Sequence, residues 1–341
     1  MKQLTAVVFV LLFPFCLFSQ LTSGTDYSNI PAVDAPQSFA GIVLYNERSE
    51  SLWNAGSETG SSFSAKSEMV GFGYGLFFSY PVKSDIITLF SADHMYRDIT
   101  SSAVITDQDG IREGLKIPSV NFHEISVSFS AMAGRNYEAG ARLLHFSGET
   151  LRSNQIGLYG SYRVYSNRNR YLGITAEVAS EGNEVITDSL MIHALSIPAF
   201  SAGINTGFGP EEAFYGAEIS YLSFHASSVR DETQGYMNAK FYHGRSFREA
   251  KARIYVEAGG NISDEFSAPT VRLPLFYYNI LFGTELIERR LNIDIGWNYG
   301  IYRTMISDMK EMDELNDHFN ISGISDDSGS YKFSIKLTLR L

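Results

Sequence analysis

The chain has 341 residues, and its 27 Lys and Arg stand against 38 Asp and Glu, which gives a formal net charge of −11. This acidic balance, without a basic run, excludes nucleic acid as an expected partner, and a hydrophobic fraction of 44% excludes wholesale disorder. The mean hydropathy of −0.08 is that of an ordinary soluble protein, but a membrane β-barrel can share it because its strands alternate apolar and polar residues.

The N-terminus predicts a secretory signal peptide over residues 1–19. A long apolar run follows the positively charged Lys2, and a polar stretch comes after it. A membrane anchor is one alternative, although the run is short for a spanning helix. Lipidation of Cys16 is another, although the residues before it lack the small side chains of a lipidation site. We expect residues 20–38 to be an extended segment and residues 39–341 to be one domain.

Period-two alternation of side chains is the dominant pattern in the remaining chain. In residues 70–80, Val, Phe, Tyr and Leu alternate with Gly and Ser, which lines the large side chains along one face of a strand. Similar segments lie at 124–131, 137–143, 156–164, 172–178, 200–208, 215–221, 251–258, 291–301 and 331–341, and weaker ones lie near 39–46, 84–97, 234–243 and 272–283. The strongest segments are about as long as the 9–11 residues that a membrane-spanning strand needs.

The connections alternate between short and long. Short turns are predicted near 81–83, 134–136, 166–170, 209–212 and 287–290, and longer loops near 47–61, 98–120, 147–154, 180–197, 224–233, 259–271 and 303–329. Outer-membrane barrels have short turns at one end and long loops at the other. The sequence therefore predicts an all-β fold, a single antiparallel up-and-down transmembrane β-barrel of about 14 strands, with about 12 or 16 as alternatives. A secreted soluble β-protein remains the alternative class.

The two faces of the predicted strands differ in chemistry. The polar face is expected to line the lumen, and its candidate residues are Glu124, Glu138, Arg142, Arg163, Glu177, Glu218, Arg253 and Asp294. Their mixed signs favour cross-strand ion pairs and a plugged or narrow interior. The apolar face is expected to meet lipid, with candidate membrane-interface aromatics Tyr74, Tyr80, Tyr137, Tyr221, Trp297, Tyr299 and Tyr331.

Three features together resemble outer-membrane barrels of the Bacteroidota type: a leader that ends in Phe-Ser-Gln, strands rich in Tyr, Phe and Gly, and an alternating strand up to Leu341. Ser38-Phe39-Ala40-Gly41 and Ser328-Gly329-Ser330-Tyr331 resemble the PorP/SprF family of type IX secretion membrane proteins. That resemblance implies a role in protein secretion, with secretion-machinery proteins as partners, and assigns no site residue.

Enzyme signatures are not found in the sequence. His123-Glu124 begins like a zinc-protease motif, but Val127 stands where the second histidine is required. Asp107 and Asp109 resemble half of a calcium loop, and a solvated acidic turn explains them as well. Met residues at helical spacing in 303–329 suggest a short amphipathic helix, as a lid or a packed loop. We expect no enzyme activity, no cofactor and no metal.

The sequence thus predicts an outer-membrane barrel with membrane lipid as a partner. Its expected function is that of a component or channel in protein secretion or transport. The alternatives are uptake of hydrophobic or other small molecules and, for a soluble protein, binding of a partner or glycan. Fold alone does not choose among these.

Overall fold

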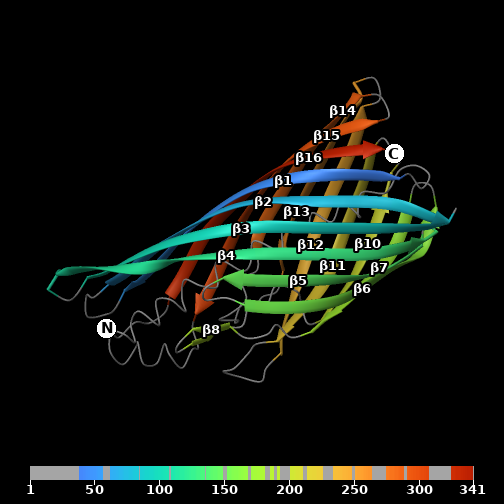
Figure 1. The fold of residues 1–341 in the computed structure, drawn as a ribbon. Coiled ribbons are helices and arrows are strands. Elements are labelled where there is room, and N and C mark those ends of the chain that lie inside the picture. Colours follow the sequence, from blue (N-terminus) through green and yellow to red (C-terminus); the bar gives the residue numbers. More distant parts are fainter. Residues whose placement is uncertain are drawn as a thin grey trace.

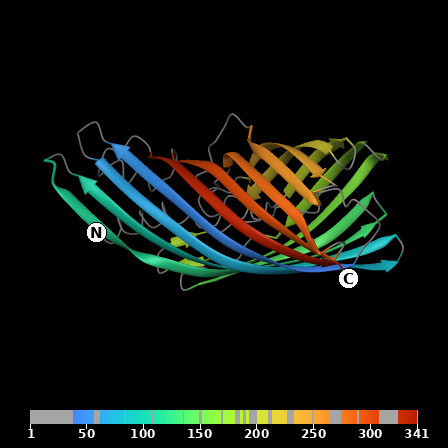
Figure 2. The same cartoon turned by 90° about the horizontal axis from the view of Figure 1, so that it is seen from above.

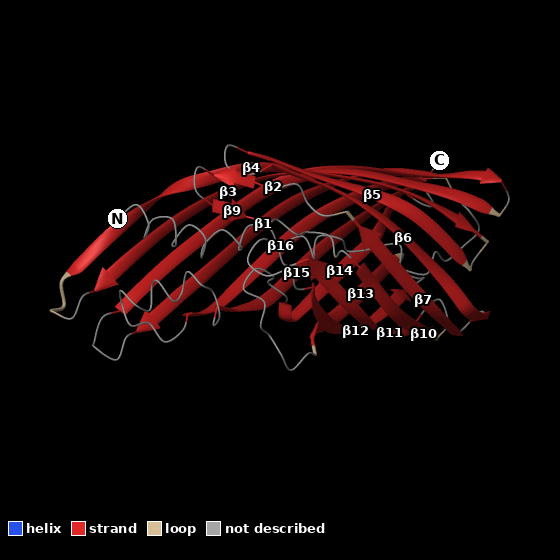
Figure 3. Ribbon diagram, turned by 90° about the horizontal axis from the view of Figure 1, so that it is seen from below, coloured by secondary structure: helices blue, strands red, loops and turns tan. Residues whose placement is uncertain are grey.

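The computed structural model describes residues 38–56, 62–83, 85–106, 109–134, 136–148, 152–167, 170–180, 185–187, 190–192, 200–209, 213–225, 233–247, 250–262, 274–287, 290–306 and 324–340. The predicted signal peptide and most of the segment 20–38 lie outside these residues. Strands dominate the described chain, which contains no helix (Figure 3). Among the residues so described, no helix is long and apolar enough to cross a membrane.

Sixteen strands are present, in chain order. They are β1 (Phe39–Gly56), β2 (Ser62–Lys83), β3 (Ile86–Thr106), β4 (Arg112–Ala133), β5 (Tyr137–Gly148), β6 (Arg152–Asn167), β7 (Arg170–Ala179), β8 (Val185–Thr187), β9 (Leu190–Ile192), β10 (Phe200–Phe208), β11 (Ala213–His225), β12 (Thr233–Phe247), β13 (Ala252–Asn261), β14 (Pro274–Ile287), β15 (Leu291–Ile306) and β16 (Ile324–Arg340).

Fourteen of these strands form one closed antiparallel barrel (Figure 1). Each strand pairs with its neighbours in the chain, except that β7 pairs with β10 and β1 pairs with β16 to close the sheet. The predicted fold class and the predicted count of 14 are therefore confirmed. The short strands β8 and β9 form a separate two-stranded sheet inside the predicted loop 180–197, and the alternation of side chains did not predict them.

The alternation along each strand separates an outer from an inner face. On β2, the side chains of Phe72 and Leu76 are more than half exposed, whereas Gly73 between them is buried on the inside. The same division holds around the barrel, where exposed large apolar side chains point outward from thirteen of the fourteen strands. In water this surface would be unfavourable, so it is the surface of a barrel that spans a membrane.

Four neighbouring strands are much longer than a membrane requires. Strands β1 to β4 have 18, 22, 21 and 22 residues, whereas β7 has 10 and β10 has 9. The long strands project past one end of the barrel (Figure 2). The predicted loops 47–61 and 98–120 were therefore wrong in part, because strand structure continues to Gly56 and Thr106 and resumes at Arg112.

Two other predicted loops are also shorter than expected. Strand β5 ends at Gly148 and β6 begins at Arg152, and β15 continues to Ile306 before β16 begins at Ile324. The suggested amphipathic helix in 303–329 falls mainly on residues outside the described ones. At the opposite end of the barrel the connections are tight, and Gly134 and Gly209 adopt positive φ angles of 61° and 114° in two of the turns.

The outer face of the long strands changes character where they leave the apolar band. Lys66 on β2 forms 2.8 Å ion pairs with Glu50 and Glu68, and Arg48 lies 3.8 Å from Glu68. Hydrogen bonds to Glu50 and then Glu68 raise the pKa of Lys66, and the bond from Lys66 lowers the pKa of Glu68. Exposed charges of this kind are stable in water and costly in lipid. The charged side chains of Arg48, Glu50, Lys66 and Glu68 therefore mark the end of the lipid-facing surface on these strands.

The outward face of the barrel predicts where a charge is tolerated. Ile204 lies at the centre of β10 and is 60% exposed, so we expect Ile204→Arg to lower the free energy of unfolding by about 2–4 kcal/mol in lipid bilayers. The control Thr100→Arg lies on β3 opposite Glu68, outside the apolar band, and should cost at most about 1 kcal/mol. Guanidinium titration of vesicle-inserted protein measures both, and equal costs would contradict the assigned depth.

Candidate functional site

The structure places the predicted interface aromatics on the outer surface. Those with the largest exposure are Tyr80 and Tyr137, and Trp297 stacks near Tyr331 with ring centroids 6.4 Å apart. Tyr299 packs on its outward neighbour Tyr278 at 5.5 Å. The remaining two, Tyr74 and Tyr221, are also exposed on the outside. Their interfacial role stays a prediction.

The predicted lumen residues all point to the inside of the barrel, and several of them pair. Arg253 donates to both carboxylate oxygens of Asp294 at 2.7 Å, and Arg142 donates to Glu177. The other predicted lumen residues also face inward; they are Glu124, Glu138, Arg163 and Glu218. Glu218 bonds to Lys240, which the sequence analysis missed, at 3.1 Å.

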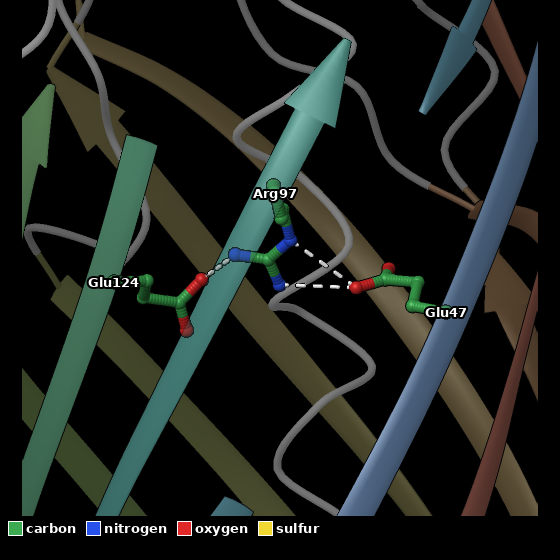
Figure 4. A network of polar contacts seen from close by, with 3 residues as sticks. All are labelled: Glu47, Arg97 and Glu124. Carbon is green, nitrogen blue, oxygen red and sulfur yellow. Dashed lines mark hydrogen bonds and ion pairs between the residues drawn. The ribbon is translucent and has the colours of Figure 1, made fainter. Parts of the chain in front are cut away.

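A fully buried arginine inside the barrel lies between two carboxylates (Figure 4). Arg97 on β3 is 0% exposed, and its Nε and Nη2 donate to one oxygen of Glu47 on β1 at 3.2 and 3.1 Å. Its Nη1 donates to Glu124 on β4. A guanidinium presents several donors in one plane, so it can bind both carboxylates at once.

Only Glu124 of this cluster was predicted from the sequence. Glu47 fell in a predicted loop, and Arg97 was the last residue of a weak predicted strand. A usable pattern was present, because Asp93, Met95 and Arg97 continue the inward register of β3. The alternation was hard to recognise because the outward positions that follow, Asp98 and Thr100, are polar rather than apolar.

A second set of charges links the strands at the closure of the barrel. The Tyr45 hydroxyl on β1 donates to Asp93 on β3 at 3.0 Å. From β16, the Lys332 ammonium lies 4.1 Å from the centroid of the Tyr45 ring. Gly75 on the intervening strand leaves room for Asp93, because a Cβ there would collide with its carboxylate. These contacts join β16, β1 and β3 across the seam between the first and last strands.

Beside the Arg97 cluster lies an apolar surface on the inner wall, which we call the apolar lumen patch. It consists of Met69, Met95, Ile99, Phe122, Leu144 and Phe146, from β2 to β5. The rings of Phe122 and Phe146 lie 6.1 Å apart, and Arg97 lies 5.9 Å from the ring of Phe122. Each member of the patch is at most 5% exposed, so this part of the inner wall is shielded from water.

Metal chemistry finds little support in the geometry. His123 points outward from β4 and Glu124 points inward, so they cannot ligate one ion. Within the described ranges, no group of three or more His, Cys, Asp and Glu is placed to hold a metal. Of the calcium-like turn, Asp107 lies outside the described residues and Gly110 has a φ of 77°.

Several solved structures are similar to this chain in fold. A TodX monoaromatic hydrocarbon channel, in its deltaS2 mutant form, is 9% identical over 91% of each chain, with a TM-score of 0.50. A FadL homologue from Pseudomonas aeruginosa is 9% identical over 91% of each chain, with a TM-score of 0.48. The P. putida toluene transporter TodX is 8% identical over 92% of this chain and 91% of its own, with a TM-score of 0.46.

At such low identity the comparison establishes the fold alone: this chain has the 14-strand barrel fold of outer-membrane proteins. No protein-family model matches the chain, and no curated protein matches it. The resemblance to Bacteroidota barrels and to the PorP/SprF family therefore stays a prediction, as does the role in type IX secretion.

The Arg97 cluster makes a testable prediction about stability. Arg97→Met should lower the free energy of unfolding by about 3–5 kcal/mol, because it leaves the carboxylates of Glu47 and Glu124 buried without a partner. The triple variant Glu47→Gln, Arg97→Met, Glu124→Gln should recover most of this loss. Denaturant titration in micelles measures both.

The matched control for this experiment is Lys66→Met, which breaks an ion pair on the exposed outer face. Because water already screens that pair, its removal should leave the unfolding midpoint unchanged. If Arg97→Met were as harmless as Lys66→Met, the cluster would not be a buried electrostatic unit.

Proposed function

We propose that this protein is an outer-membrane channel through which small hydrophobic molecules cross. The observation that carries the proposal is the apolar lumen patch. A membrane barrel needs apolar side chains on its outside, but a water-filled pore has a polar interior. Six large apolar side chains that face inward and are shielded from water therefore favour contact with an apolar ligand.

The charges of the interior support passage of neutral rather than ionic molecules. Arg97, Arg142 and Arg253 are each bonded to a carboxylate. Ion-selective pores carry rings of one sign of charge, whereas the described lumen pairs opposite charges on neighbouring strands. This pairing neutralises the charges of the inner wall within the protein, so the apolar lumen patch sets the character of its part of the interior.

Two observations support a location in the outer membrane. The outward apolar surface requires lipid, and the barrel fold is similar to that of a TodX channel. The TodX structures are described as a toluene transporter and a monoaromatic hydrocarbon channel. For the present chain, the corresponding ligand class is part of the proposal.

Uptake of a hydrophobic fluorophore tests the proposal. In Gram-negative cells that express the protein, N-phenyl-1-naphthylamine should brighten faster than in cells without it, because the dye fluoresces after it reaches apolar surroundings. We expect the double variant Phe122→Asn, Phe146→Asn to slow this uptake about tenfold, since each change removes apolar contact from the path. The variants are compared at equal amounts of folded protein in the outer membrane.

The control is Leu222→Asn, an inward apolar residue on β11 outside the patch, which should leave uptake near the wild-type rate. Equal rates with and without the protein would refute the proposal. Detergent-solubilised protein addresses the secretion alternative in the same preparation: a stable complex with secretion-machinery proteins, together with unchanged dye uptake, would favour that alternative instead.

A further inference from the structure

A row of polar side chains crosses the inner wall on strands β12 to β16, which lead up to the seam with β1. Successive strands β12 to β16 place one inward residue each at matching register. These residues, which we call the lumen row, are Tyr242, Glu257, Asn279, Asn298 and Lys332. Neighbours in such a row have Cβ atoms about 4.5–5.5 Å apart, so their side chains can share one ligand.

Asn279 provides the first indication of a ligand. Its side chain is 3% exposed on the inside of β14, yet the amide Nδ2 has no hydrogen-bond partner within the described part of the structure. A buried donor without a partner is costly, and in native proteins such groups usually bind something. The missing partner must be a hydrogen-bond acceptor, because an amide nitrogen only donates.

Glu257 provides a neighbouring acceptor. It faces Asn279 directly across the β13–β14 ladder and accepts one hydrogen bond, from the Tyr255 hydroxyl, at 2.8 Å. An ionised carboxylate has room for about four hydrogen bonds. A donor at Asn279 next to an acceptor at Glu257 matches a hydroxyl group, which accepts through its oxygen and donates through its hydrogen.

Aromatic rings lie near Glu257, on the side of strand β12. Tyr242 lies next to Glu257 in the lumen row, and its ring centroid is 6.2 Å from Tyr255 and 6.3 Å from Phe214. The Tyr242 ring lies over Gly216 on β11, where a Cβ would overlap it, and its hydroxyl donates to the Thr206 carbonyl on β10 at 3.4 Å. The ring beside Glu257 is therefore that of Tyr255, whose hydroxyl bonds to the carboxylate. Rings at this spacing offer faces and edges to another aromatic molecule. Glu257 and Tyr255 are only partly buried, so the site meets the lumen at this point.

The charges around the lumen row favour a neutral ligand. Lys332 is the only cation of the row, and it faces Glu47 across the β1–β16 ladder and lies over the Tyr45 ring. Glu257 is negative and lies directly beside Asn279. An anionic ligand at Asn279 would therefore meet a carboxylate at close range, whereas a neutral hydroxyl would not.

We propose that Asn279, Glu257 and the ring of Tyr255 form a lumenal subsite for a neutral hydroxylated aromatic molecule of the phenol class. The ligand oxygen accepts from Nδ2 of Asn279, its hydroxyl donates to Glu257, and its ring packs against Tyr255. The inference rests on the proposed passage of hydrophobic small molecules and adds the polar group that the ligand carries.

Equilibrium dialysis of the purified full-length protein in detergent tests the subsite, with protein-free micelles as the blank. The probes are 4-methylphenol and p-xylene, which have similar shape and differ in one hydroxyl. We expect the wild-type protein to bind 4-methylphenol about tenfold more tightly than p-xylene, because two hydrogen bonds are added. Asn279→Leu should remove about tenfold of the 4-methylphenol affinity and leave that for p-xylene unchanged.

Two further variants keep the test decisive. Asn279→Asp preserves shape and removes the donor, so it should lose 4-methylphenol affinity even if Asn279→Leu fails to fold. Asn292→Leu is the control, because Asn292 is an equally buried inward asparagine on β15 away from the lumen row, and it should bind both probes as the wild type does. Resistance of the barrel to SDS at room temperature verifies folding.

Three outcomes overturn the inference. Equal wild-type affinity for both probes would show that the hydroxyl is not recognised. Unchanged 4-methylphenol affinity in both Asn279 variants would show that the amide serves only ordered water. Binding of p-xylene without preference, together with normal dye uptake, would refute the subsite and leave the proposed function standing, whereas no binding of either probe and no uptake would refute both.

Discussion

Closure of the backbone hydrogen-bond ladder is the constraint on which the rest of the structure depends. In hydrocarbon every backbone N–H and C=O must be paired within the protein, so a sheet can span a membrane only if its edges meet. Here the pairing of β1 with β16 satisfies that condition over almost the whole length of β1. Once the sheet is closed, each strand has one face toward lipid and one toward the lumen, and the chemistry of the two faces follows.

The inner face shows how a closed lumen can be both charged and apolar. Arg97 satisfies Glu47 and Glu124 on the strands around it, and the apolar lumen patch begins at Phe122, against which the guanidinium packs. On strands β12 to β16, the lumen row keeps one amide donor of Asn279 unsatisfied. In the proposed subsite, that unsatisfied donor contrasts with the saturated Arg97 cluster, whose polar groups satisfy one another.

Much of the fold could be predicted from the sequence because period two survives wherever one face meets lipid. Residues 70–80 and 291–301 alternate cleanly and lie in β2 and β15. The pattern fades in β1 and β3 beyond Glu47 and Arg97, where the outer face is polar, so the sequence predicts loops there. The interior partners were harder to predict, since Arg97 and Glu47 lie 50 positions apart and only the register of three strands brings them together.

The unequal strand lengths divide the barrel into two mechanically different walls. One wall, β1 to β4, carries ladders about twice as long as those of β7 and β10, and both the Arg97 cluster and the closing seam lie within or beside it. Each extra rung must break before its strand can separate, so opening fluctuations concentrate in the short wall. The barrel is therefore stiff along its seam and compliant opposite it, and amide hydrogen exchange through the wall will begin in β7 and β10.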